Sequence, residues 1–433
     1  MKLHNISFIL CLASTLAISG CASDETSDHD WWSGTGGSSG TAGSSGTGGQ
    51  SNDAGPPETG GASGDAGTSG SNGDTGGTGG SDTDASPNLS PYLITSPYAG
   101  VDWVSSGQYK ASLHSHTSNS DGSSSLANML EDMYSKDYDI IAITDHDYLT
   151  VDWVHATNGL TQSRFDAMAA GVGRGGRGML QIPYTIEQSR GDHVNTYLAN
   201  YNNKAGQGNP TFLEESIAAA TAHSGISRIN HPGRYTGADV NMEQGAAISN
   251  NPAVVKKYVD LFMGTEAVGM EIINKRDGES LSDRILWDNI LTQTIPQGRY
   301  VWGFSEDDTH STGATGYSFN VFLQPENTLE HFSSTMHNGV FYAVAKVAKR
   351  ELGAAFVGSG PTPVVRAISI DESTACITIT AEHTNKIQWI SRGTVVAESA
   401  TICIDDTVDV YVRANLSGPG GIAFTQPFGV SLR

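Results

Sequence analysis

The sequence has little positive charge. Among its 433 residues, 24 are Lys or Arg and 46 are Asp or Glu, so the formal net charge at pH 7 is −22. Sequence-independent nucleic-acid binding depends on basic side chains that neutralise phosphates. We therefore expect no stable nucleic-acid binding, although clustered carboxylates can still hold cations locally.

Cysteine is also scarce, with four residues in the chain: Cys11, Cys21, Cys376 and Cys403. None has a second cysteine close by, so a thiolate metal site is not indicated. Cys376 and Cys403 both lie near the C-terminal end. In a compartment that permits disulfides, we expect these two to form a structural bridge.

The first 21 residues are too short for a membrane-spanning helix. Lys2 precedes an apolar run at residues 6–12, a pattern typical of an export signal. Ile18-Ser19-Gly20-Cys21 resembles a bacterial lipobox, which implies a lipid anchor at Cys21. Because Ala22 follows, the resemblance favours the outer membrane of the cell envelope, periplasmic or surface-exposed. An ordinary signal cleaved near Ala22 is the alternative.

Residues 22–95 contain no Lys or Arg and few aliphatic side chains. Gly, Ser and Thr dominate, with ten carboxylates among them. A segment of this composition buries too little apolar surface to offset the entropy of ordering. We expect an acidic tether here, followed by folded units at residues 96–358 and 359–433.

From about residue 108 the apolar pattern alternates between two periods. Residues 109–113 and 139–143 have the pattern of strands, and residues 124–136 have that of a helix with one apolar face. Similar strand and helix segments follow to about residue 304. This alternation predicts an α/β fold with a largely parallel sheet, in which sites gather at the carboxyl ends of the strands.

The C-terminal region has a different pattern. Residues 364–433 alternate with the period of strands, and Gly, Asn and Asp occupy the breaks. The pattern predicts a small antiparallel β-sandwich, in which a bridge between Cys376 and Cys403 would add stability.

His114 and His116 follow the first predicted strand and, two residues apart, point to the same side. Taken alone, this pair fits a polar strand end with solvated histidines. However, a His or a carboxylate follows nearly every predicted strand. Such groups on one rim would repel each other or lose hydration, and bound divalent cations remove both penalties. The set as a whole therefore predicts a metal site.

Taken in order, these motifs resemble those of the PHP (polymerase and histidinol phosphatase) family over about residues 109–345. The matching segments are His114-Ser115-His116-Thr117 with Asp121, Thr144-Asp145-His146-Asp147, Glu187, Asn230-His231-Pro232 and Asp308-Thr309-His310. The resemblance implies a distorted seven-stranded β/α (TIM-like) barrel with up to three metals at the strand carboxyl ends. Known members of the family are phosphoesterases.

The resemblance also implies which residues hold three divalent metals. The first site would use His114, His116, Glu187 and Asp308; the second Glu187 as a bridge with His193 and His231; the third Asp121, His146 and His310. Imidazole with carboxylate suits Mn, Fe or Zn. The sequence departs from the family at two points. The segment between Glu187 and His193 is short, and Asp307 competes with Asp308, which alone keeps a two-residue spacing to His310.

The implied activity is hydrolysis of phosphoric ester bonds in a small phosphorylated substrate, with a hydroxide bridging two metals as the nucleophile. A barrel that binds metal or ligand without turnover is one alternative. A metal-dependent amide or ester hydrolase is another, because a metal hydroxide attacks carbonyl carbon as well.

Arg234 and Asp145 are assigned to catalysis. Arg234, three residues beyond His231, is a candidate phosphate clamp, since guanidinium forks match phosphate oxygens. A surface salt bridge is an equally good interpretation of Arg234. Asp145 and Asp147 flank His146 and would orient its ring. Glu271, in the strand at residues 268–273, is a further candidate for such a supporting role.

Overall fold

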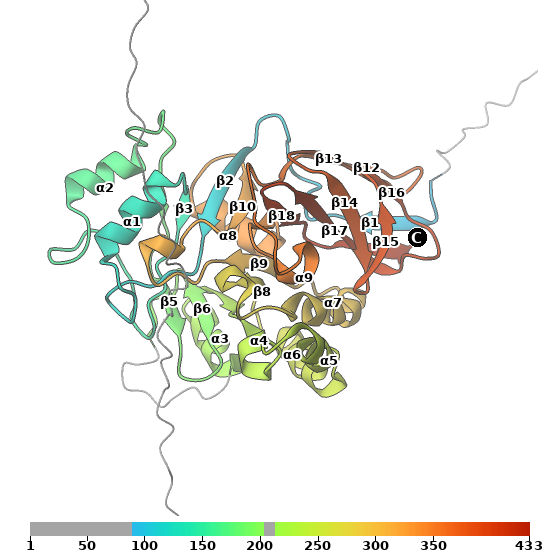
Figure 1. Ribbon diagram of the computed structural model, residues 1–433, viewed down its shortest axis with the longest axis horizontal. Helices are drawn as coiled ribbons and strands as arrows, with labels where there is room; N and C mark the ends of the chain where they lie inside the picture. Colours follow the sequence, from blue (N-terminus) through green and yellow to red (C-terminus); the bar gives the residue numbers. More distant parts are fainter. Residues whose placement is uncertain (1–88, 203–212) are drawn as a thin grey trace, which may run out of the picture. The chain divides into compact units, whose positions relative to one another are not determined.

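A computed structural model describes residues 89–202 and 213–433 (Figure 1). The export signal, Cys21 and nearly all of the expected tether lie outside the described residues. Residues 92–95, which the sequence assigned to the tether, instead form strand β1 (Tyr92–Thr95) and pair with the last strand of the chain. Within the described ranges, no helix has both the length and the apolar character needed to cross a membrane.

Residues 107–352 alternate between strands and helices. The elements are β2 (Gly107–Ser112), α1 (Leu126–Ser135), β3 (Ile140–Ile141), α2 (Gln162–Ala169), β4 (Leu180–Gln181), β5 (Ile186–Gln188), β6 (Val194–Tyr197), α3 (Leu213–Ala222), β7 (Ile226–Ile229), α4 (Pro232–Thr236), α5 (Met242–Ser249), α6 (Pro252–Gly264), β8 (Gly269–Asn274), η1 (Lys275–Asp277), α7 (Asp283–Thr294), η2 (Ile295–Gln297), β9 (Trp302–Glu306), η3 (Thr312–Ala314), β10 (Ser318–Gln324), α8 (Leu329–Asn338), β11 (Phe341–Ala345) and α9 (Lys349–Leu352).

Helix α1 shows how the sequence sets these elements. The side chain of Ser125 accepts a hydrogen bond from the backbone N–H of Asn128 and caps the first turn. The face that carries Leu126, Met129 and Met133 is buried, as the helical spacing of these residues predicts.

The strands of this region form two sheets. In the larger sheet β4, β3 and β2 run parallel, and β10 and β11 continue it in antiparallel fashion; the smaller sheet has the order β5-β6-β7-β8-β9. The predicted mixture of α-helices and β-strands is confirmed, but the prediction of a largely parallel sheet is wrong, because β2–β10, β10–β11, β5–β6 and β6–β7 all pair in antiparallel fashion. The predicted barrel is not closed by strand pairing among residues 89–202 and 213–433. Two isolated parallel bridges, Ser115 with Thr309 and His146 with Glu187, connect the sheets instead.

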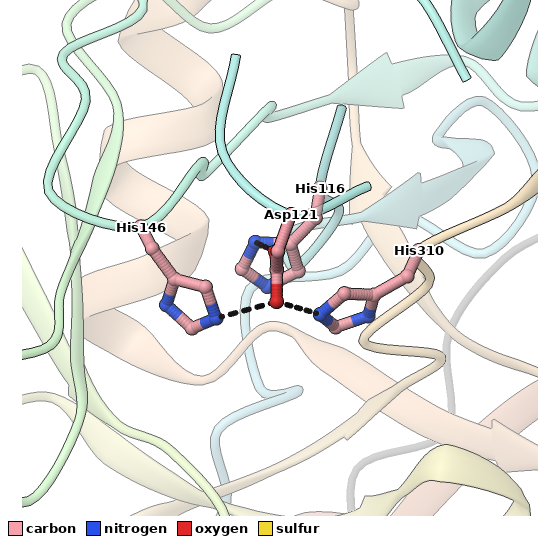
Figure 2. Close-up of side chains that lie close together, drawn as sticks. All are labelled: His116, Asp121, His146 and His310. Atoms are coloured by element: carbon pink, nitrogen blue, oxygen red, sulfur yellow. Dashed lines mark ion pairs between the residues drawn. The ribbon is translucent and has the colours of Figure 1, made fainter. Parts of the chain in front are cut away.

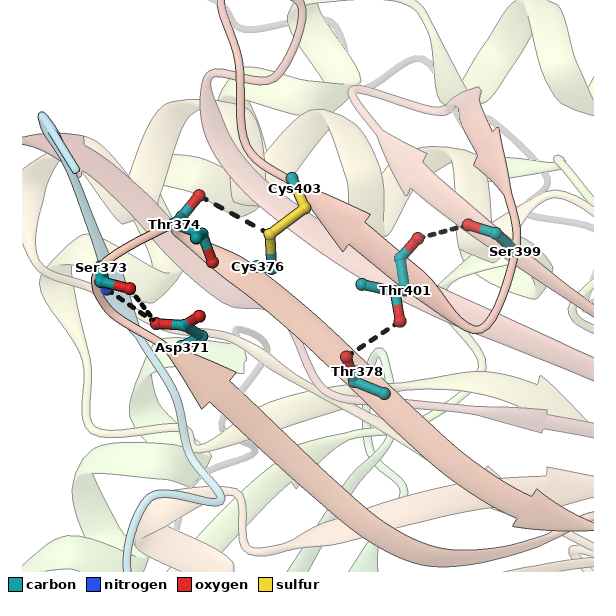
Figure 3. The surroundings of a disulfide bond; sticks show 8 residues. All are labelled: Asp371, Ser373, Thr374, Cys376, Thr378, Ser399, Thr401 and Cys403. Atoms are coloured by element: carbon teal, nitrogen blue, oxygen red, sulfur yellow. Dashed lines mark hydrogen bonds between the residues drawn. A yellow bond between two sulfur atoms is a disulfide. The ribbon is translucent and has the colours of Figure 1, made fainter.

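Antiparallel strands make up the C-terminal region, as predicted. They are β12 (Val364–Asp371), β13 (Cys376–Glu382), β14 (Lys386–Ser391), β15 (Thr394–Glu398), β16 (Thr401–Cys403), β17 (Val410–Gly418), β18 (Gly421–Phe424) and β19 (Phe428–Leu432). The predicted disulfide between Cys376 and Cys403 is confirmed. It joins directly opposed positions of β13 and β16, with the two Cα atoms 3.9 Å apart (Figure 3).

This region is not a separate sandwich, which corrects the prediction. Strand β18 pairs with β11, so β17, β19, β1 and β14 continue the larger sheet. Strands β12, β13 and β16 form a second, three-stranded sheet. The two layers share one apolar core, to which Ile377 contributes from β13 and Trp389 and Leu416 from β14 and β17. The sheet continuity depends on pairing between distant segments, which local periodicity does not report.

A buried ion pair also connects the two regions. Arg413 in β17 places Nε and Nη2 each 2.7 Å from the carboxylate oxygens of Asp288 in α7, and the Tyr411 hydroxyl donates to the same carboxylate at 2.8 Å. Asp288 is 6 % exposed and Arg413 is 3 % exposed. Removing one member would leave the other charge buried without compensation.

We therefore expect Asp288→Ala to lower the free energy of unfolding by about 3–5 kcal/mol, measured by chemical denaturation. The matched control is Asp260→Ala, which removes the exposed partner of Lys256 in α6. An exposed pair of this kind is worth less than about 1 kcal/mol. Equal losses for the two variants would contradict a coupling role for the buried pair.

Candidate metal centre

The ends of the strands bring all the predicted ligands together. Groups of possible ligand atoms within 4.8 Å of one another comprise His114, His116, Asp121, His146, Glu187, His193, His231, Glu279, Asp308 and His310. Glu279, which follows η1, is the one member that the sequence did not single out. The two isolated bridges lie in the middle of this set, because Ser115 separates two of the histidines and the other bridge joins His146 to Glu187.

The inner part of the cluster is fully enclosed. His114 Nε2 lies 3.2 Å from Glu187 Oε1 and 3.3 Å from Asp308 Oδ1. His116 Nε2 lies 3.3 Å from Glu187 Oε2 and 3.0 Å from the same Asp308 oxygen. These four side chains are at most 3 % exposed. They are the residues expected to form the first metal site.

Glu187 lies at the centre of the cluster. His193 Nδ1 is 2.9 Å and His231 Nε2 is 3.5 Å from Oε1, while His146 Nδ1 is 2.9 Å from Oε2. Its two oxygens thus face different sets of imidazoles. This is the arrangement that a bridging carboxylate requires.

The outer part of the cluster is open to solvent. Asp121 Oδ2 lies 3.2 Å from His310 Nε2 and 3.6 Å from His146 Nε2 (Figure 2). His116 Nδ1 lies 3.8 Å from the other Asp121 oxygen. Asp121 is 44 % exposed, whereas His116 is buried. His116 therefore separates the inner from the outer group, and the outer group is the accessible side.

The donor atoms fit divalent cations. Seven buried atoms of the cluster have no hydrogen-bond partner within the described structure: His114 Nε2, both ring nitrogens of His116 and of His231, Glu187 Oε2 and Asp308 Oδ1. Several face each other at ion-pair distance but not in hydrogen-bonding geometry. Buried polar groups are nearly always paired. Converging unpaired imidazole and carboxylate atoms are the ligand set that suits transition-metal ions.

Carboxylates and imidazoles in the cluster shift each other's pKa. Burial alone would lower the pKa of His114, but Asp308, Glu187 and Glu271 outweigh it and raise that pKa well above 6.5. Burial would likewise lower the pKa of His116, but Asp308 and Glu187 outweigh it and raise that pKa to about 9. Without metal the cluster therefore retains protons at neutral pH, and binding a cation must displace them.

Glu271 in β8 orients the inner histidine. Its Oε1 lies 2.7 Å from His114 Nδ1, which turns Nε2 towards the carboxylates. Its Oε2 accepts from the backbone N–H of His231 at 2.9 Å. Arg228 in β7 bridges Glu271 and Glu306 at 2.9 and 2.7 Å. The sequence assigned a supporting role to Glu271 but none to Arg228 or Glu306, although charged residues within or at the end of apolar strand runs were a visible signal.

Asp145 does not orient His146, which corrects that prediction. Its oxygens accept from the backbone N–H and the hydroxyl of Thr117, at 2.6 and 2.7 Å, and from the Ser120 hydroxyl at 2.7 Å. His146 Nδ1 instead lies 2.6 Å from Ser189 Oγ. Asp145 therefore fixes the loop that carries Asp121.

Of the two competing carboxylates, Asp308 reaches the cluster and Asp307 does not. Asp307 accepts hydrogen bonds from the backbone N–H groups of Gly316 and Ser318 instead. Arg234 in α4 is 46 % exposed, and its Nη1 lies 3.4 Å from Glu279 Oε2. The salt bridge that the sequence left open for Arg234 is thus present.

We expect Asp145→Ala to weaken metal binding at the outer group by about 10–100-fold, as other losses of ligand-supporting groups do. The reason is that the loop bearing Asp121 loses three hydrogen bonds. Calorimetric titration with Mn or Zn measures the effect. Asp152→Ala is the control, since its exposed carboxylate serves a backbone N–H away from the cluster. An equal loss at every metal would contradict a role confined to this loop.

No family model matches the chain, and no curated protein matches it. Among solved structures, it is similar to a two-domain protein from Bacteroides vulgatus containing a predicted PHP-like metal-dependent phosphoesterase (14% identity, TM-score 0.38, 79% of this chain and 88% of that one). It is also similar to an amidohydrolase from Chromobacterium violaceum (14% identity, TM-score 0.28, 47% of this chain and 88% of that one). A third similar structure is a lesion-specific endonuclease from Pyrococcus furiosus (16% identity, TM-score 0.33, 53% of this chain and 56% of that one). At TM-scores this low the likenesses carry no argument, and the chemistry rests on the side chains described above.

Proposed function

We propose that the protein is a metal-dependent phosphoesterase with a centre of three divalent cations, drawn from Mn, Fe and Zn. The observation that carries the proposal is the set of buried imidazole and carboxylate atoms around Glu187 and Asp308 that have no hydrogen-bond partner within the described structure. The inner group, the Glu187–His193–His231 group and the outer group around Asp121 each supply enough ligands for one cation.

Bound divalent cations would supply an activated water and neutralise charge on a phosphate. The residues of this chain have separate tasks. Glu187 and Asp308 provide the negative charge that concentrates cations in the interior. Glu271 fixes the ring of His114. In the outer group, Asp121 is 44 % and His310 is 29 % exposed, so a substrate would approach the metals from this side.

A phosphate ester is favoured over an amide or carboxylic ester because of charge. Two cationic side chains, Lys275 and Arg234, lie beside the acidic cluster and are partly exposed. These cations would attract an anionic substrate but would not attract a neutral carbonyl substrate. The same argument opposes a site that only stores metal, since such a site gains nothing from neighbouring cations.

We expect the double variant His114→Ala, His116→Ala to lose bound metal and phosphate-ester hydrolysis together. Both losses should exceed about 100-fold, the upper end of the loss caused by removing a residue that only supports a ligand. Metal analysis and phosphate release over a panel of monoesters and diesters measure both. His223→Ala, an exposed histidine at the end of α3, is the control.

Other outcomes of that panel separate the alternatives. A metal-loaded wild type that hydrolyses carboxylic esters or amides but no phosphate ester would favour the carbonyl hydrolase. A wild type that holds its metals and turns over none of these substrates would favour a binding protein.

We also propose that a lipid on Cys21 anchors the protein at the cell envelope, at the outer membrane. The proposal rests on the lipobox-like sequence and on the acidic segment that follows. Cys21→Ser should move the protein from the membrane fraction to the soluble fraction and abolish fatty-acid labelling. Cys11→Ser, inside the apolar run of the signal, should change neither. Membrane association of the Cys21 variant equal to that of the wild type would rule the anchor out.

A further inference from the structure

Two cationic side chains, those of Lys275 and Arg234, lie side by side at the edge of the predicted metal-binding cluster. Lys275 Nζ is 3.5 Å from Asp308 Oδ2 and 3.1 Å from Glu279 Oε1. Arg234 Nη1 is 3.4 Å from Glu279 Oε2. Glu279 therefore binds the Lys275 ammonium group with one carboxylate oxygen and the Arg234 guanidinium group with the other. Lys275 is 32 % and Arg234 is 46 % exposed, so each retains N–H groups that solvent or a ligand can reach.

The position of Lys275 is imposed by a strained turn. Lys275, Arg276 and Asp277, which form η1, have φ values of 45°, 54° and 57°. L side chains rarely adopt this region, and such strain persists at functional sites when the surroundings impose it. Here the anchor is Asp277, whose oxygens lie 2.6 and 2.9 Å from Arg284 Nη1 and Nη2 in the protein interior.

Close packing at Gly233 fixes the position of Arg234. A side chain on Gly233 would lie 2.7 Å from Asp283 Oδ1 and 3.0 Å from the backbone oxygen of Glu279. The Gly233 N–H donates to Asp283 Oδ2 at 3.1 Å. Helix α4 can therefore pack closely on the segment from Glu279 to Asp283 only with glycine at this position. This close approach brings Arg234 to Glu279.

Glu279 supports the two cations and is not needed as a metal ligand. It lies near His231 and Asp308 in ligand-like geometry. However, the Lys275 ammonium group contacts both Glu279 and Asp308 Oδ2. A metal ion held there would be repelled at close range by that ammonium group, so a fixed cation already neutralises this pair of carboxylates.

We propose that Lys275 and Arg234, held by Glu279, form a clamp for a terminal phosphate, so that the preferred substrates are phosphomonoesters. The inference rests on the proposed phosphoesterase function and adds its substrate class. A monoester presents more free, charged oxygens than a diester, which carries a second organic group. A compact ammonium and a guanidinium fork match those extra oxygens. Contact with Asp308 places this pair beside the centre and not on a remote surface.

The first test measures binding of inorganic phosphate to the metal-loaded full chain by calorimetry. Lys275→Gln and Arg234→Gln should each weaken binding about 10–100-fold, the value of a charge-assisted contact. Lys275→Arg should retain most of the affinity. Lys256→Gln, an exposed lysine on α6, is the control and should bind like the wild type. Metal content should stay unchanged in Arg234→Gln, Lys275→Arg and Lys256→Gln. It is measured in Lys275→Gln as well, because that change frees the carboxylates of Glu279 and Asp308.

The second test compares kcat/KM for p-nitrophenyl phosphate and bis(p-nitrophenyl) phosphate. The monoester should be preferred, and Lys275→Gln should reduce that preference. Phosphate binding that is unchanged in both charge variants would overturn the clamp. Loss of a metal in Glu279→Gln would also overturn it, because Glu279 would then be a ligand.

The two proposals fail in distinguishable ways. If the wild type hydrolyses neither ester, the phosphoesterase function fails, and the phosphate titration still decides the clamp. If the wild type is active but the variants lose both esters equally, the clamp fails and the function stands.

Discussion

The carboxylate of Glu187 is the constraint on which the rest of the site depends. It is fully buried and is contacted by the imidazoles of His114, His116, His146, His193 and His231. Burial raises its pKa, but the surrounding histidines, led by His193, lower it well below 4.5, so the group stays ionised. An ionised carboxylate in the interior must be compensated. The shared need for compensation explains why side chains from both sheets converge on this one residue.

This convergence also explains how much of the site the sequence could predict. Most of the ligands follow strands that run parallel to a neighbour, β2 and β3 in the larger sheet and β7 and β9 in the smaller one, and the carboxyl ends of parallel strands share one side. His193 is an exception, because it precedes β6, which runs antiparallel to β5 and β7. The spacing to His310 likewise favoured Asp308 over Asp307, and only Asp308 reaches the cluster. The role predicted for Asp145 was wrong. Its adjacency in sequence to His146 suggested contact between the two side chains, whereas the Asp145 side chain contacts the loop at residues 117–120.

Residues that act through three-dimensional contact were beyond sequence reasoning. Lys275 directly follows the strand β8, yet nothing local indicates that a strained turn directs its side chain to Asp308. In the fold, the α/β alternation was readable because each helix carries its own periodic face. The continuation of the larger sheet from β11 into β18 was not, because that pairing joins residues about eighty positions apart. The buried pair of Asp288 and Arg413 depends on the same distant contact.

Charge connects the site to the whole chain. With 46 acidic and 24 basic residues, the protein repels phosphate at long range. Salt screens that repulsion beyond about 10 Å at 0.1 M ionic strength, whereas partly buried charges act at contact distance. Attraction of an anion must therefore come from cations placed locally. In the proposed function, metal ions in the buried carboxylate cluster would be one such source, and the pair formed by Lys275 and Arg234 would be a second. If the substrate carries a phosphate, as proposed, an acidic protein must select it by close-range geometry, because the overall field of the protein does not attract it.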